Sequence, residues 1–89
     1  MAESGRIEEL RRRLDREPGS RLFAQLAEEL RKAGESGEAA RVARRGLVQH
    51  PGYTSARLTL AKALLELGEF PPARGELETV LRAAPDNIL

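Results

Sequence analysis

The sequence has no cysteine or tryptophan, three other aromatic residues and one histidine. Without cysteine it can form no disulfide framework, thiolate nucleophile or thiolate metal site. One histidine, His50, cannot build a zinc site of the usual kind, and its place at the end of a helix favours a structural role. No HExxH, GxSxG, Walker or dinucleotide-binding motif is present. We therefore expect no enzyme activity, no metal and no cofactor.

Long apolar runs and a large net charge are also lacking. Arg57, Lys62 and Glu66 interrupt even the most leucine-rich part, which excludes a membrane span. Residues 1–9 carry several charges and no apolar stretch of the signal-peptide kind, so a cytoplasmic protein is expected. The formal net charge is only +1, which disfavours a nucleic-acid partner. The excess of arginine over lysine is associated with GC-rich bacterial genomes.

Two arginine clusters, within residues 11–16 and 41–45, leave nucleic-acid binding open as a less favoured alternative. Neighbouring glutamates neutralise part of each cluster. Only Phe23, Tyr53 and Phe70 are available to stack on bases. A solvated basic surface is the simpler interpretation.

The apolar residues are mainly leucine and alanine, which favours helices over strands. Glycine and proline breakers predict five helices, at about 4–16, 20–33, 36–50, 54–67 and 70–84. Ser20 and Ser36 are the predicted N-caps of the second and third helices. Gly34 should take the left-handed position after the second helix, and Gly68 should end the fourth. The expected buried residues include Leu67 in the fourth helix and Leu77, Val80 and Leu81 in the fifth.

Two stretches of the chain match at an offset of 34 residues. Leu26, Ala27, Leu30, Gly34, Glu35, Ala39, Leu47 and Pro51 recur as Leu60, Ala61, Leu64, Gly68, Glu69, Ala73, Leu81 and Pro85. A period of 34 with this spacing resembles the tetratricopeptide repeat family over residues 20–87. Phe23 keeps one family aromatic, whereas Arg57 and Leu64 stand where others are usual. The small residues Ala27, Ala39, Ala61 and Ala73 should let paired helices approach closely.

The resemblance implies an all-α fold, a right-handed α-solenoid of antiparallel helix hairpins. Within one domain, 1–89, a leading half-repeat helix would span 4–19, the first repeat 20–53 and the second 54–87. The sequence stops where another helix would begin, so we expect a segment of a longer array.

The resemblance also implies a non-catalytic protein-interaction scaffold whose first helices line a concave groove for a peptide or helix. The predicted groove residues are Arg21, Gln25, Glu28, Lys32, Ser55, Thr59, Lys62 and Glu66. Their mixed charge suits hydrogen bonds to a peptide backbone better than an apolar anchor. The lysine and asparagine set with which some relatives grip a carboxylate is absent, so a clamp of that kind is not expected.

The open end of the stack is a second predicted surface, because an uncapped terminal repeat leaves apolar residues against water. Val80, Ala84, Ile88 and Leu89 are the residues predicted there. The isolated chain is accordingly expected to form a homo-oligomer, most simply a dimer. A module that only self-associates, with no groove ligand, stays open as an alternative.

Overall fold

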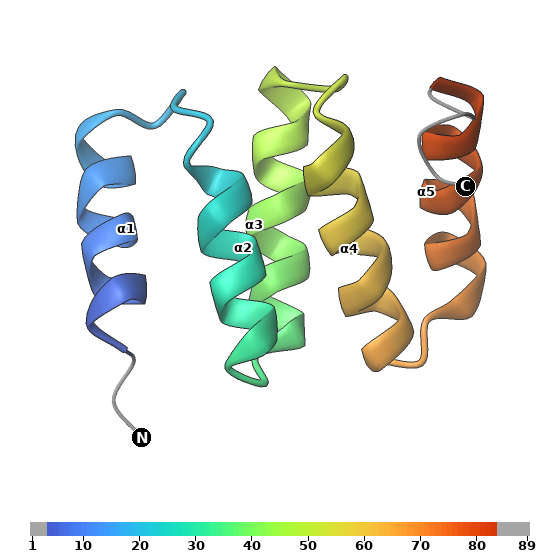
Figure 1. The fold of residues 1–89 in the computed structure, drawn as a ribbon, viewed down its shortest axis with the longest axis horizontal. Helices are drawn as coiled ribbons and strands as arrows, with labels where there is room; N and C mark the ends of the chain where they lie inside the picture. The colour runs from blue at the N-terminus through green and yellow to red at the C-terminus, as the bar shows by residue number, and fades with distance from the viewer. Residues whose placement is uncertain (1–3, 84–89) are drawn as a thin grey trace.

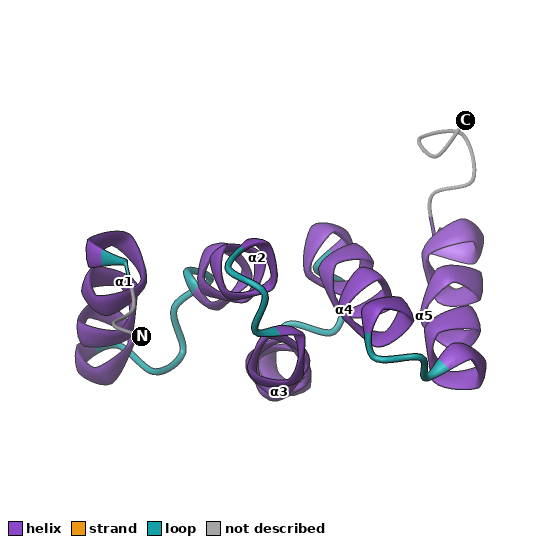
Figure 2. Ribbon diagram, turned by 90° about the horizontal axis from the view of Figure 1, so that it is seen from below, coloured by secondary structure: helices purple, strands orange, loops and turns teal. Residues whose placement is uncertain are grey.

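The computed structural model describes residues 4–83, which form five helices joined by short turns (Figure 1). They are α1 (Gly5–Arg16), α2 (Phe23–Lys32), α3 (Ser36–Gln49), α4 (Thr54–Glu66) and α5 (Phe70–Ala83). This part of the chain contains no strand, so the predicted all-α fold is confirmed. The helices pack side by side, and α3 lies behind the layer that contains α2 and α4 (Figure 2).

Glycines end two of the helices as predicted. Gly34 and Gly68 have positive φ angles of 87° and 78°, which glycine adopts without steric cost. The amides that follow, those of Glu35 and Glu69, each donate to a carbonyl five residues earlier at 2.9 Å. Each turn is thus a Schellman motif that reverses the chain between α2 and α3 or between α4 and α5.

Two predicted N-caps are wrong. Helix α2 begins at Phe23, because Ser20 forms its own turn, in which its hydroxyl accepts from the Leu22 amide at 3.1 Å. Helix α3 begins at Ser36 itself, and that hydroxyl donates to Glu66 in α4 at 2.7 Å. The first case is a local turn, whereas the second is a contact between residues distant in the sequence.

The core is built from leucine and alanine at the helix interfaces. The four alanines predicted to lie between paired helices, at positions 27, 39, 61 and 73, have no exposed surface. Small side chains there allow α2 to pack closely on α3, and α4 on α5. Ile7 and Leu10 attach α1 to the same core, beside α2.

The predicted buried side of α5 is only partly correct. Val80 is buried, with 2% of its surface exposed, but Leu77 and Leu81 are exposed, as is Leu67 after α4. Among the described helices α5 packs only against α4. One side of α5 is therefore covered, and no described helix covers the other.

Candidate functional site

The predicted groove residues do not form one continuous free surface. Gln25, Lys32, Ser55 and Lys62 are exposed on α2 and α4 as expected. Gln25 accepts a hydrogen bond from Arg6 of α1 at 2.8 Å, and Lys32 lies 3.6 Å from Glu29.

Arg21 precedes α2 instead of lying on it. Its guanidinium lies over the ring of Tyr53, 5.4 Å from the centroid. This cation–π contact joins the turn before α2 to the turn before α4.

Three other groove candidates, Glu28, Thr59 and Glu66, are used in a polar contact between the two hairpins. Arg31 donates to both oxygens of Glu28, at 3.0 and 2.8 Å, and to Glu66 at 2.8 Å. Thr59 is buried and donates to Glu28 at 3.2 Å. Together with Ser36 these residues form what we call the junction network, which holds α2, α3 and α4 together.

Electrostatics keep the carboxylates of the junction network ionised. The hydrogen bonds from Arg31 lower the pKa of Glu28, and the Lys62 charge lowers it further. The Ser36 hydroxyl, followed by Arg31, lowers the pKa of Glu66, while hydrogen bonding to Glu28 raises the pKa of Arg31. These carboxylates are satisfied inside the fold, so the remaining candidates would have to make most contacts to a ligand.

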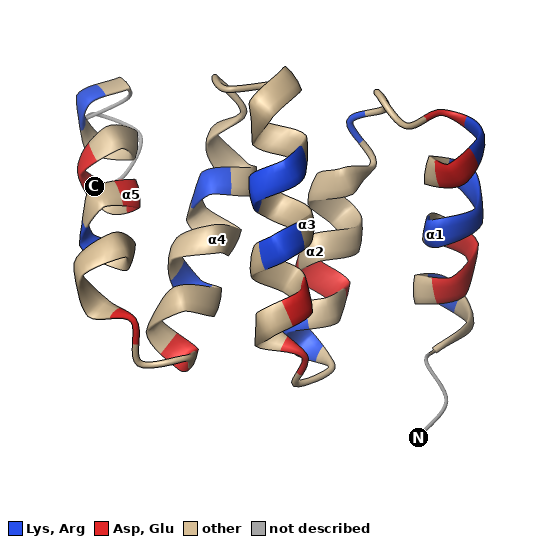
Figure 3. Ribbon diagram, turned by 180° about the vertical axis from the view of Figure 1, so that it is seen from behind, with Lys and Arg blue, Asp and Glu red and all other residues tan. Residues whose placement is uncertain are grey.

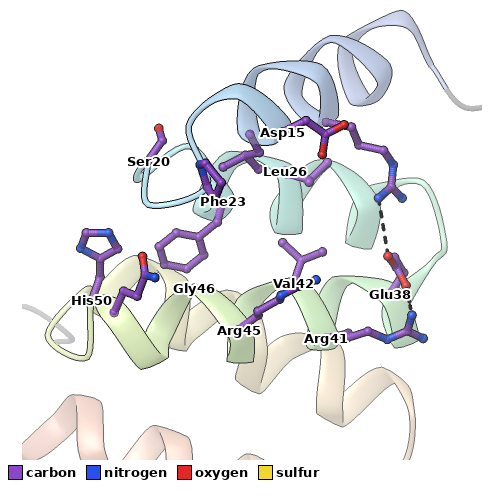
Figure 4. A pocket seen from close by; sticks show the side chains of 14 residues that line it. Asp15, Ser20, Phe23, Leu26, Glu38, Arg41, Val42, Arg45, Gly46 and His50 are labelled. Atoms are coloured by element: carbon purple, nitrogen blue, oxygen red, sulfur yellow. Dashed lines mark ion pairs between the residues drawn. The ribbon is translucent and has the colours of Figure 1, made fainter.

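The rear of the molecule has a hollow that the sequence did not predict. It has a volume of about 500 Å³ and lies between α1, the start of α2 and α3 (Figure 4). Phe23, Leu26 and Val42 line its middle. At one end Glu38 pairs with Arg41 at 2.8 Å and with Arg11 at 3.5 Å. Cations of α3 gather on this same rear face (Figure 3).

A glycine inside α3 shapes this hollow. The ring of Phe23 packs directly on Gly46, and a Cβ atom there would overlap with it. Phe23 also stacks on His50, with centroids 5.8 Å apart, and meets Tyr53 edge-on at 5.6 Å. The His50 ring lies 2.8 Å from the Gly19 carbonyl through Nε2, and this contact links the end of α3 to the turn before α2.

The second hairpin fills the equivalent space differently. At an offset of 34 residues Arg57 replaces Phe23, Glu76 replaces Val42 and Val80 replaces Gly46. Arg57 pairs with Glu76 at 2.8 Å and donates to the Pro51 carbonyl at 2.9 and 3.1 Å. Glycine at position 46, where the second hairpin has Val80, is the sequence signal that distinguishes the space beside Phe23 from the equivalent space beside Arg57.

The open end of the stack carries four of the six large apolar side chains that are exposed within residues 4–83. Leu65 of α4 and Phe70, Leu77 and Leu81 of α5 are 45%, 62%, 36% and 43% exposed. We call these four residues the open face. Val80 was predicted both on the buried side of α5 and at this open end; it is buried against α4, so its place in the open end is wrong. Ala84, Ile88 and Leu89 lie outside the described residues.

Chemical features other than binding surfaces are scarce. No group of three or more His, Asp or Glu side chains that could hold a metal ion occurs within residues 4–83. None of the helices in this part of the chain is both long and apolar enough to cross a membrane.

Comparison with known families agrees with the repeat pattern. A family model described as tetratricopeptide repeat matches residues 30–89, more than half of the chain. A search of curated proteins and a search of solved structures each found no match. With its 34-residue period and its helix hairpins, the chain belongs to the tetratricopeptide repeat family.

Proposed function

We propose that this protein is a non-catalytic scaffold that binds a peptide or helix of a partner protein across α2 and α4. Repeats of this family generally mediate protein–protein interaction. The observation that supports this surface is that both helices carry exposed polar side chains, Gln25 and Lys32 on α2 and Ser55 and Lys62 on α4. Helix α3 covers one side of the layer that contains α2 and α4 (Figure 2). A partner held there would satisfy its backbone polar groups with side chains that the core does not use.

The junction network supports this proposal by fixing the spacing of α2 and α4. Arg31 bonds to one carboxylate on each helix, so their relative position is set before any partner arrives. A surface that is already ordered loses less conformational entropy on binding. Lys62 is exposed and lies close enough to Glu28 to lower its pKa, so this surface carries a cation beside the junction network.

Peptides selected from a random display library on the wild-type chain test this proposal. Their affinities are then measured by fluorescence anisotropy for Lys62→Glu and Gln25→Ala. We expect Lys62→Glu to weaken binding about tenfold, equivalent to ~1.4 kcal/mol, because it removes a cation and adds a repulsive charge. Arg44→Glu, an exposed site on α3, is the matched control. Selected peptides that bind all variants equally well would contradict the proposed surface.

The cytoplasmic and bacterial setting expected from the composition stays a prediction. Separation of the natural host's cells into soluble and membrane fractions, followed by immunodetection, would test it.

A further inference from the structure

The open face matches a face that is covered elsewhere in the same molecule. Leu65, Phe70, Leu77 and Leu81 stand 34 residues after Arg31, Ser36, Ala43 and Leu47. In the first hairpin, Arg31 and Ser36 bond to Glu66 of α4, and Ala43 and Leu47 are buried. The helix that covers this face in the first hairpin is therefore α4. The second hairpin repeats the face without a helix on it among the described residues.

The replacements make the open face more apolar than its covered counterpart. Leucine stands at 65 where position 31 is arginine, and phenylalanine stands at 70 where position 36 is serine. Side chains of this size gain about 25 cal/mol for each Å² removed from water. Exposed apolar patches of this kind mark interaction sites. A shallow hollow between the end of α4 and the start of α5 adds relief to the patch.

Arg74 lies in the middle of this surface, where the first hairpin has the buried Ala40. A helix packed as closely as α4 packs on α3 would bury the Arg74 guanidinium, at a large desolvation cost. Arg74 pairs with Glu78 one turn later, at 3.2 Å. The open face thus combines an apolar row with one cation and one anion, which makes it complementary to itself.

The opposite end of the stack is polar. Helix α1 exposes no large apolar residue. Its exposed charged residues include Glu8, Glu9, Arg12, Arg13 and Arg16. Head-to-tail stacking would place the open face against those charges. The charged groups would lose their contacts with water and gain no polar partners in return. A two-fold contact places apolar on apolar, and closed two-fold dimers are the commonest oligomers.

We propose that the open face binds the open face of a second copy of this chain in a two-fold dimer with the two α5 helices antiparallel. A register with Arg74 opposite Glu78 of the second copy also places the two Leu77 side chains near the axis. In the same register, Phe70 lies opposite a position one residue from Leu81 of the second copy. The apolar row and the charges are therefore satisfied together in one arrangement.

Sedimentation equilibrium of the 89-residue chain from about 1 µM to about 1 mM tests the dimer. The expected mass rises from 9.8 kDa to twice that value. Leu77→Glu should weaken dimerisation at least about tenfold, because a carboxylate would be buried near the axis. Val48→Glu is the matched control, since Val48 is largely exposed on α3, far from the open face in sequence and on another helix. A monomer at all concentrations, or growth into larger assemblies, would overturn the proposal.

Charge reversal tests the register. Arg74→Glu and Glu78→Arg should each dimerise at least about tenfold more weakly than wild type, because each places like charges opposite one another. An equimolar mixture of the two variants should form a heterodimer, since position 74 of each copy then faces a charge of opposite sign at position 78 of the other. Circular dichroism of each variant controls for folding. Failure of the mixture to associate, with both variants folded and wild type dimeric, would overturn this register.

This proposal and the proposed function can fail separately. Lys62→Glu lies on the surface of α2 and α4 and should leave the mass unchanged. Leu77→Glu should leave binding of the selected peptides unchanged.

Discussion

Substituting Gly46 by alanine should destabilise the protein, although the same change stabilises most helices. Gly46 lies in the interior of α3, where alanine is favoured over glycine by about 1 kcal/mol. The new Cβ atom, however, would overlap with the Phe23 ring. That ring also contacts His50 and Tyr53, so turning it away from the new Cβ atom would disturb both contacts.

Overpacking of this kind costs about 1–3 kcal/mol. Against the gain in helix propensity, we expect a net loss of up to about 2 kcal/mol in the free energy of unfolding. In a domain of this size each kcal/mol lowers Tm by about 4–8 °C. Gly75→Ala, in the interior of α5, meets no heavy atom within 4 Å and should instead stabilise by about 0.5–1 kcal/mol.

Urea unfolding followed by far-UV circular dichroism measures both variants. All samples must share one protein concentration, because any self-association would contribute to apparent stability. A double-mutant cycle with Phe23→Leu isolates the clash: in that background Gly46→Ala should cost less or even stabilise. Equal stabilisation by Gly46→Ala and Gly75→Ala would refute the argument that Phe23 requires a glycine beneath it.

Two further predictions concern the turns and the junction network. Because the folded-state pKa values of Glu28 and Glu66 are lowered from their ordinary 4.5, their stabilising contribution is present above pH 4.5 and is lost as the pH falls below it. Arg31→Ala should lower stability at pH 7 and flatten this acid-dependent loss, which thermal melts between pH 7 and pH 3 would detect; an unchanged profile would argue against ionised carboxylates in the network. Gly34→Ala should destabilise by about 1 kcal/mol, because φ is positive there and alanine is strained in that region. Gly68→Ala should behave likewise, and chemical denaturation that showed no loss for either variant would contradict the role of the two Schellman turns.

The helix count and the hairpin turns could be predicted from sequence because their signals are local. Gly34 and Gly68 sit at equivalent places in a 34-residue period, and each ends a helix as expected. The alanines between paired helices were also predictable, since close packing requires small residues there. Such features depend on neighbours within a few residues or on the repeat itself.

Contacts between hairpins were not predictable in the same way. Ser36 has the sequence position of an N-cap, yet its hydroxyl bonds to Glu66, 30 residues away. Thr59 lies on a polar stripe, yet Glu28 draws it into the junction network. A helical stripe assigns residues to a face but does not say which other helix covers that face.

The apolar residues of α5 show the same limit. The helical spacing predicts burial equally for Leu77, Val80 and Leu81. Of these three, only Val80 is buried against α4. Which of them is covered depends on the tertiary neighbours of α5. Three of the residues predicted for self-association lie beyond position 83, outside the described part of the chain. The open face consists instead of exposed residues from both α4 and α5.

The contact between Phe23 and Tyr53 provides an intrinsic spectroscopic probe. Tyr53 is the single tyrosine and the chain has no tryptophan, so its emission alone reports on one place, the turn that joins the two hairpins. Far-UV circular dichroism averages over all five helices instead. Coincident transitions by the two signals would indicate that the hairpins unfold as one cooperative unit. Earlier loss of the tyrosine signal would mean that the repeats separate before they melt, as nearest-neighbour coupling in repeat proteins allows.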